Sequence, residues 1–266
     1  MSTAPLLQIR GLGVYYATAH GAVDAVNDLD LDLGAGECLG LVGESGSGKT
    51  AVLLAIMGLL SSQARLRGNI RYRGTELLGL GAPALNALRG ARIAMVFQDP
   101  MSALNPYLRV IDQLSEVSRV HGGSSRRAAE QRALEMLESV QIGEPERRAR
   151  QYPHQLSGGM RQRVMIAMAL MAEPEIVLAD EPTTALDVTV QAQILSLLQQ
   201  VRARTGAALL LVTHDLGVVA QLADRVGVMR AGRLLELADC ERLFASPRHA
   251  YTQTLLAALP KLELPA

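Results

Sequence analysis

The sequence GESGSGKT at residues 43–50 lies between the apolar segment CLGLV at 38–42 and a second apolar segment, AVLLAIMGLL, at 51–60. It matches the pattern G-x-x-x-x-G-K-[S/T], which requires a buried strand before it and a helix after it. Glycines let the backbone amides of such a loop approach phosphates where a side chain would collide. The following helix adds the positive end of its dipole. We therefore predict a phosphate-binding loop between a strand and a helix.

Side chains of this loop complete a nucleotide site. Lys49 would place a point charge on the β- and γ-phosphates, and Thr50 would offer a hydroxyl to Mg²⁺. The residues that we expect to bind ATP here are Gly43, Glu44, Ser45, Gly46, Ser47, Gly48, Lys49, Thr50 and Ala51.

A metal-bound nucleotide also needs carboxylates, and the segment EIVLADEPTTALD at 175–187 supplies them. Asp180 follows an apolar strand, at the strand end where ligands bind in open α/β sheets. We expect Asp180 to hold Mg²⁺ through its water shell and Glu181 to polarise the attacking water. His214 also follows an apolar strand, which would place it at the same edge of the sheet.

The remaining pattern predicts an α/β fold. Short apolar runs typical of buried parallel strands recur with helical patterns between them. These runs are 38–42, 93–97, 176–179, 208–213 and, more weakly, 226–229. Residues 6–35 alternate partly, as in an antiparallel sheet. Residues from about 100 to 165 contain no convincing strand, so we expect a helical insert there.

Composition limits the possible functions. The chain has 266 residues, 49% of them hydrophobic, so it can bury a substantial core. Its 26 Lys and Arg balance its 26 Asp and Glu, which disfavours a nucleic-acid partner. The apolar segments are about half of the ~20 residues that a membrane-spanning helix requires. No secretory signal is evident at the start, so we expect a cytoplasmic chain.

The segment LSGGMRQR at 156–163 decides the family. Ser157, Gly158 and Gly159 would open a helix and so form a second anion site at a helix N-terminus. With the phosphate loop and ADEPTTALD, this segment resembles an ATP-binding cassette (ABC) ATPase. That family uses the second site in trans, on the ATP that a partner cassette holds.

The resemblance extends over residues 6–260 and implies further roles. Tyr16 resembles the aromatic residue that stacks on adenine. Gln98 resembles the glutamine that contacts Mg²⁺ and communicates with the membrane subunits. Asp187 resembles an aspartate that acts with Ser157 across the cassette pair, and His214 the histidine at the γ-phosphate. The implied catalytic set is Glu181, His214, Lys49 and Gln98, and the implied Mg²⁺ ligands are Thr50, Gln98 and Asp180.

The resemblance also implies the organisation of a single ABC ATPase domain over residues 1–266, built on a RecA-like P-loop core with a mostly parallel sheet. We expect an antiparallel β subdomain at 1–36 and the nucleotide-binding core at 37–98 and 166–235. A helical subdomain at 99–165 and a C-terminal extension at 236–266 complete the prediction. Met160 departs from the glutamine that is frequent in the family. A methionine cannot supply that side-chain hydrogen bond, but Ser157 and the backbone remain.

Longer stretches, among them FQDPMSALNPYLRV and YPHQLSGGMRQRVMIAMAL, are similar to the peptide/nickel import branch, particularly to oligopeptide and dipeptide importers. This similarity implies two permease subunits, a second ATPase subunit, with a heterodimer favoured, and an extracytoplasmic binding protein. The chain would then lie on the cytoplasmic face of the inner membrane. Many members carry a cysteine-rich segment for an iron–sulfur cluster. Cys38 and Cys240 do not match it, so we predict no cluster.

Three alternatives stay open at this point. The first alternative solute is nickel or a metal chelate, because short members of the branch import those. An ABC ATPase acting on DNA or ribosomes is disfavoured by the net charge of zero and by the absence of coiled-coil arms. A nucleotide-binding scaffold without turnover conflicts with the presence of both Glu181 and His214.

Overall fold

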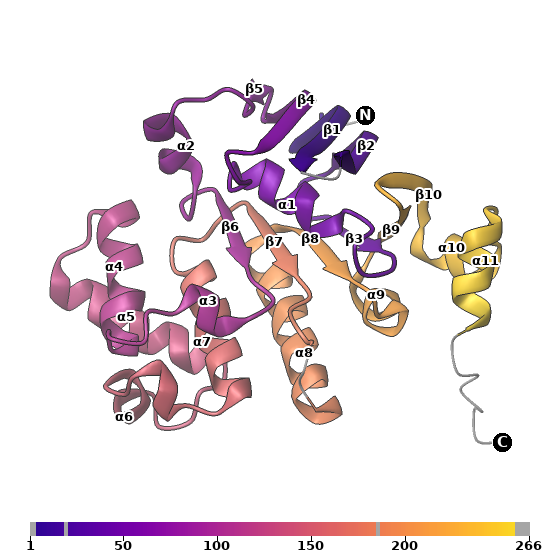
Figure 1. Ribbon diagram of the computed structural model, residues 1–266. Coiled ribbons are helices and arrows are strands. Elements are labelled where there is room, and N and C mark those ends of the chain that lie inside the picture. The colour runs from indigo at the N-terminus through magenta and orange to yellow at the C-terminus, as the bar shows by residue number, and fades with distance from the viewer. Residues whose placement is uncertain (1–3, 19–20, 185–186, 259–266) are drawn as a thin grey trace, which may run out of the picture. The chain divides into compact units, whose positions relative to one another are not determined.

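In the computed structural model the chain folds as an α/β protein, and the structure describes residues 4–18, 21–184 and 187–258 (Figure 1). The chain divides into two compact units. The first unit comprises Met1–Leu33, Glu37–Leu78 and Leu211–Ala266, and the second comprises Gly34–Gly36 and Gly79–Leu210. The predicted α/β class is confirmed.

The first unit contains an antiparallel sheet with the strand order β2-β1-β4-β5. Its strands are β1 (Leu7–Thr18), β2 (Gly21–Leu33), β4 (Ala64–Tyr72) and β5 (Thr75–Glu76). The antiparallel pairing of β1 with β2 confirms the expectation for residues 6–35. The sequence did not predict β4, because Ile70 and Tyr72 are the only buried side chains in that strand.

The first unit also holds the strand that precedes the phosphate loop. Strand β3 (Cys38–Val42) is buried at all five positions and pairs in parallel with β9 (Arg225–Arg230). Strand β10 (Arg233–Asp239) adds to β9 in antiparallel orientation. The helices of this unit are α1 (Lys49–Met57), α9 (Leu216–Leu222), α10 (Cys240–Ala245) and α11 (Ala250–Ala257).

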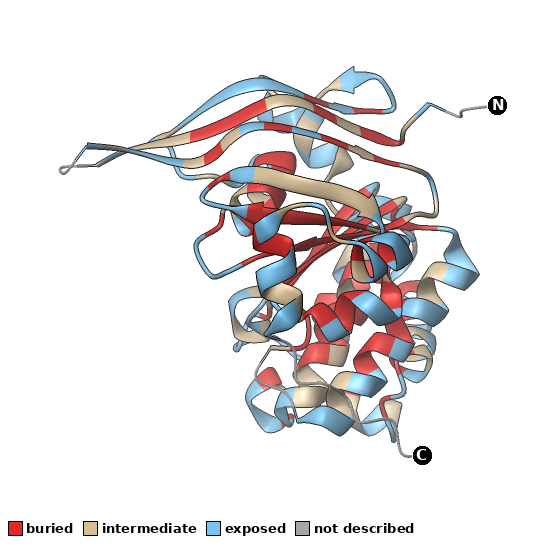
Figure 2. Ribbon diagram, turned by 90° about the vertical axis from the view of Figure 1, so that its right-hand side faces the viewer, coloured by how far each residue is buried: buried red, intermediate tan, exposed pale blue. Residues whose placement is uncertain are grey.

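The second unit has the parallel strand pair β6 (Ile93–Val96) and β7 (Ile176–Asp180), all of whose residues are buried. Strand β8 (Ala208–Thr213) contains the division between the two units. Buried residues are red in Figure 2, and they include every residue of β3, β6, β7 and β8. The continuous apolar runs therefore identified strands covered on both faces.

Between β6 and β7 the chain is helical at every described element, as predicted for the insert (Figure 1). The helices are α3 (Pro100–Ala103), α4 (Val110–Gly122), α5 (Arg126–Ser139), α6 (Pro145–Ala149) and α7 (Gly158–Leu170), with a 3₁₀ turn at Pro153–Gln155. Helix α2 (Ala82–Leu88) precedes β6, and α8 (Val188–Thr205) follows β7. In the part of the chain that the structure describes, no helix has the length and apolar character needed to cross a membrane.

Candidate functional site

The phosphate loop in the first unit requires glycine at two of its positions. Gly43 has φ 157°, and a Cβ atom there would lie 2.1 Å from the carbonyl oxygen of Met229. Gly48 has φ 102°, and a Cβ atom there would lie 2.1 Å from the carbonyl oxygen of Ala25. Backbone from β9 and β2 thus packs against the loop too closely for any side chain. The glycine spacing read from the sequence is therefore a steric requirement of this fold.

Lys49, the first residue of α1, is only 5% exposed. Its Nζ donates hydrogen bonds of 2.8 Å to the carbonyl oxygens of Gly43 and Glu44, and one of 3.2 Å to Ser47 Oγ. These acceptors fix the ammonium group against the inner side of the loop. A cation already positioned in this way is suited to bind phosphate oxygens without a large loss of side-chain entropy. Thr50 follows it and is exposed.

Tyr16 and His214 also belong to the first unit. Tyr16 lies near the end of β1, half-buried, opposite Val23 of β2 and Ala64 of β4. His214 is exposed between β8 and α9. The next residue, Asp215, caps α9 by accepting the Gly217 amide at 2.8 Å, which fixes the direction of the chain after His214.

The second unit brings Gln98 and Glu181 together. Gln98 Nε2 donates to Glu181 Oε2 at 3.1 Å, and Thr184 Oγ1 donates to the same oxygen at 2.7 Å. Glu181 has a left-handed backbone, φ 44°, a conformation that costs energy outside glycine and is found at functional sites. Asp180, the last residue of β7, is 5% exposed. The two predicted acids thus lie side by side in the chain, one buried and one held by hydrogen bonds.

Sequence reasoning missed two residues of this site. Thr184 was not predicted to contact Glu181, although a hydroxyl three residues after a turn acid is a common local hydrogen-bond donor. Gln162 of α7 is 2% exposed, and its Nε2 donates to the Pro182 carbonyl oxygen at 2.6 Å. This buried bond joins the helix that begins at Ser157 to the turn that carries Glu181. A glutamine at helical spacing from Met165, Ile166 and Ala169, on an otherwise apolar helix face, was the available signal in the sequence.

The segment at 156–163 forms the start of a helix, as expected. Ser157 is the N-cap of α7, and its Oγ accepts the Met160 amide at 3.3 Å. Ser157 and Gly158 are exposed, while a Cβ atom on Gly159 would lie 2.9 Å from Val190 Cγ1 of α8. Asp187 caps α8 by accepting the Val190 amide at 2.9 Å. Val190 therefore connects the predicted aspartate to the predicted serine–glycine site within one chain.

A pocket of about 330 Å³ opens beside this helix start. Ser157, Gly159 and Met160 line it, together with Arg148 and Arg163. Arg163 NH1 donates to the carbonyl oxygens of Val140 at 3.2 Å and of Gln141 at 3.1 Å, and its NH2 bonds Gln193 of α8. The arginine thus links α7 to the turn after α5 and to α8, and stabilises the wall of the pocket.

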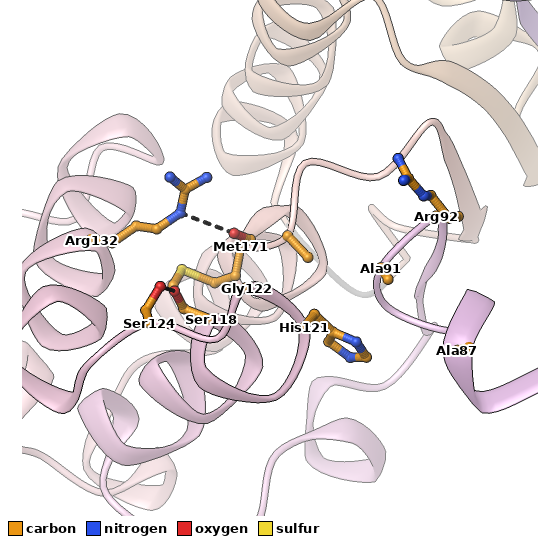
Figure 3. A pocket seen from close by; sticks show the side chains of 10 residues that line it. Ala87, Ala91, Arg92, Ser118, His121, Gly122, Ser124, Arg132 and Met171 are labelled. Carbon is orange, nitrogen blue, oxygen red and sulfur yellow. Dashed lines mark hydrogen bonds between the residues drawn. The ribbon is translucent and has the colours of Figure 1, made fainter. Parts of the chain in front are cut away.

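A larger pocket of about 540 Å³ lies elsewhere in the second unit (Figure 3). Arg132 Nε donates to the Met171 carbonyl oxygen at 3.1 Å, as the dashed line in Figure 3 shows. Arg132 and Arg92 also pair with Glu173 and Glu175, at 2.8 and 3.3 Å. Arg92 precedes β6, whereas Gln98 follows the other end of that strand. The pocket is therefore separate from the predicted site, and its arginines already have acidic partners.

The candidate ligands fit a magnesium ion that is bound together with a nucleotide. They do not resemble a site in which protein side chains supply all the ligands. Across residues 4–18, 21–184 and 187–258 no three His, Cys, Asp or Glu side chains gather as a metal site. Mg²⁺ is bound in proteins by one or two oxygen ligands with water and substrate phosphates. The Thr50 hydroxyl, the Gln98 amide and the Asp180 carboxylate are oxygen donors of this kind.

Comparisons with known proteins identify relatives of this chain. The family model described as ABC transporter matches residues 26–184. The oligopeptide transport ATP-binding protein OppD of Salmonella typhimurium is 50% identical over 258 residues, which cover 97% of this chain and 77% of that protein. OppD of Haemophilus influenzae is 48% identical, over 97% of this chain and 80% of that protein.

Solved structures of ATP-binding cassettes have a similar fold. The ATP-binding cassette MJ0796, in a dimeric post-hydrolysis state bound to ADP and Pi, aligns with a TM-score of 0.80 and 29% identity, covering 88% of this chain and 98% of that chain. CbiO1 of Clostridium perfringens, part of the transporter complex cbiONQ, aligns with a TM-score of 0.77 and 25% identity, covering 97% of each chain.

Proposed function

This chain belongs to the ABC transporter family, and we propose that it is the ATP-hydrolysing subunit of an importer that moves di- and oligopeptides across the inner membrane. The observation that carries the proposal is the 50% identity to an oligopeptide transport ATP-binding protein over 97% of the chain. The intact set of Lys49, Asp180, Glu181 and His214 supports turnover of ATP over a scaffold role.

In the proposed mechanism the phosphate loop binds ATP through its amides and through Lys49, whose ammonium is already directed at the loop. Mg²⁺, when bound with the nucleotide, neutralises negative charge on the β- and γ-phosphates. Thr50, Gln98 and Asp180 would hold it. Glu181 takes a proton from the attacking water, and His214 orients the γ-phosphate. Tyr16 supports the adenine ring by stacking.

Two cassettes would act together, head to tail. Ser157, Gly158 and Gly159 of this chain would contact the ATP held by the partner, with Asp187 beside them. The exposed Ser157 hydroxyl and the N-terminus of the 13-residue helix α7 suit that contact, because helix N-termini favour anions. ATP binding would close the pair, and hydrolysis would release it.

The proposal extends to the partners. Two integral permease subunits would receive this chain at the cytoplasmic face of the inner membrane, through the helical insert. A second, different ATPase subunit and an extracytoplasmic solute-binding protein would complete the importer, without nucleic acid and without an iron–sulfur cluster.

Glu181→Gln tests the chemistry. The variant keeps the size of the side chain but cannot accept the proton, so we expect ATP binding to persist while hydrolysis falls ~10²–10⁴-fold. ATP titration and phosphate release on the assembled transporter measure the two quantities. Undiminished turnover would remove Glu181 from the mechanism. Glu146→Gln, on the exposed surface of α6, is the matched control.

Uptake of labelled substrates tests the solute. Cells carrying this chain or its Glu181→Gln variant are compared for dipeptides, longer peptides and nickel chelates. Loss of peptide uptake alone supports the proposal. Loss of chelate uptake with peptides unaffected would assign the chain to a metal importer, and loss of neither would contradict transport.

A further inference from the structure

The C-terminal helix α11 is anchored to the first unit at both its start and its inner face. The Glu236 carboxylate of β10 accepts the Arg248 amide at 2.8 Å and the His249 amide at 3.0 Å. His249 Nδ1 in turn accepts the Tyr251 amide at 3.1 Å, which caps the helix. These bonds fix the position of Tyr251, the second residue of α11.

Tyr251 is 7% exposed and packs in the same apolar cluster as Val42, the residue directly before the phosphate loop. Leu243 of α10 and Val228 of β9 belong to this cluster, and Leu255 packs against it from one turn further along α11. The Arg230 guanidinium lies 4.6 Å from the centroid of the Tyr251 ring, a cation–π arrangement. The ring is therefore held between the end of β9 and the strand that leads into the loop.

The Tyr251 hydroxyl is buried and, among the described residues, has no hydrogen-bond partner in good geometry. A buried hydroxyl left in this way costs free energy, so its position requires an explanation. Burial raises the pKa of the Tyr251 phenol, and the neighbouring Glu44 carboxylate raises it further. Glu44 is thus an acceptor in the neighbourhood of this unused donor.

Glu44 is the only acidic residue in the phosphate loop, and it is exposed. Its carbonyl oxygen accepts the Lys49 ammonium at 2.8 Å, so the backbone of Glu44 is part of the arrangement that positions the cation. A carboxylate on a loop that binds ATP repels the phosphates unless it is directed away from them.

We propose that Tyr251 is a positioning residue for ATP binding: its hydroxyl donates to the Glu44 carboxylate, which holds that charge away from the phosphates and fixes the Glu44 peptide under Lys49. The C-terminal segment is then part of the nucleotide site, although its sequence lies some 200 residues from the loop. This inference rests on the proposed ATP-binding function.

The test compares two variants that each remove one buried hydroxyl from α11. Tyr251→Phe keeps the ring, its packing and the contact with Arg230. Thr252→Val removes the neighbouring hydroxyl, which is also buried and unpartnered among the described residues. Mg·ATP is titrated into the full-length chain by calorimetry, and thermal unfolding is recorded for each variant.

We expect Tyr251→Phe to raise the Kd for ATP about three- to tenfold, the loss of one hydrogen bond, with little change in Tm. Thr252→Val should bind ATP as the unmodified chain does. In the assembled transporter, Tyr251→Phe should raise the KM for ATP and leave kcat unchanged. A purely structural role would instead lower Tm for both variants.

A double-mutant cycle tests whether Glu44 transmits the effect. Tyr251→Phe is introduced into a Glu44→Gln background, where no carboxylate remains to be directed. We expect the effect on Kd to disappear there. Unchanged ATP affinity of Tyr251→Phe, or the same loss in both backgrounds, would overturn the proposal. An unmodified chain that does not bind ATP would instead contradict the function on which it rests.

Discussion

At the scale of single residues, the orientation of Glu181 depends on neighbouring side chains that donate hydrogen bonds to its carboxylate and to its turn. Its left-handed φ of 44° turns the chain directly after β7, and the turn presents the carboxylate to Gln98 and Thr184. Gln162 stabilises the same turn from α7. The orientation of the proposed base is therefore set by three polar side chains from separate segments.

Thr184→Val should lower kcat for ATP hydrolysis about tenfold, because it removes the 2.7 Å hydrogen bond that orients the Glu181 carboxylate. Thr184→Ser keeps the hydroxyl and should restore most of the rate. Phosphate release by the assembled transporter measures kcat, and an ATP titration should show an unchanged Kd.

Thr205→Val, at the end of α8, is the control for that experiment, because its hydroxyl bonds local backbone groups, the Val201 carbonyl oxygen and the Ala207 amide. Equal rates for Thr184→Val and the unmodified chain would show that the Thr184 hydroxyl does not orient Glu181.

At the scale of elements, one carboxylate fastens the short edge strand β5 to the antiparallel sheet of the first unit. Glu76 of β5 accepts the Ile70 amide and the Asn69 side chain at 2.9 Å each, and the Leu78 amide at 3.1 Å. Burial alone would raise the pKa of Glu76, but these hydrogen bonds and nearby Arg71 hold the pKa below its ordinary value of 4.5. The charged form thus fastens β5 to the exposed strand β4.

A group with a lowered pKa stabilises the fold above its unfolded pKa, and this contribution is lost as the pH falls through its folded pKa. Glu76→Gln should therefore lower the Tm at pH 7 by about 2–4 °C. The difference from the unmodified chain should shrink as the pH is lowered below 4.5. Thermal unfolding across this pH range measures it, with Glu116→Gln on the exposed side of α4 as control. A difference that does not change with pH would contradict the assignment.

Elements differ in how far they could be predicted, for physical reasons. The strands β3, β6, β7 and β8 are buried throughout, so their apolar runs identified them. Strand β4 is mostly exposed and rich in arginine, so its sequence has no such run. The phosphate loop was predictable because its residues are consecutive. The bond between Gln98 and Glu181 was not, because 83 residues separate them and only the fold brings them together.

At the scale of the whole molecule, the proposed cassette pair implies a surface that is exposed only in the single chain. Val188, the first residue of α8 after Asp187, is 84% exposed. Because Asp187 is proposed to act across the cassette pair, the neighbouring Val188 would be covered when two cassettes pair. The net charge of zero gives no long-range attraction to nucleic acid, in agreement with a protein partner.

Val188→Glu should weaken ATP-dependent pairing about tenfold, because a charge would be buried in the interface. The measurement is sedimentation of the Glu181→Gln variant with ATP and the second ATPase subunit, with and without Val188→Glu. The ATP affinity of the single chain should not change. Val120→Glu on α4, where valine is 68% exposed, controls for the substitution itself. Pairing unaffected by Val188→Glu would place the interface elsewhere.

The hydrogen bond from Gln98 to Glu181 also bears on how much ATP a cell loses to idle subunits. The Oε2 atom of the proposed base accepts from an amide and a hydroxyl, so that oxygen can take a proton from water only after one of these donors moves. We expect chains that have no permease to be poor consumers of ATP for this reason. If this chain were made in excess over the permease subunits, the excess copies would then hydrolyse little ATP. The expression of this chain would therefore not need to match that of its membrane partners closely.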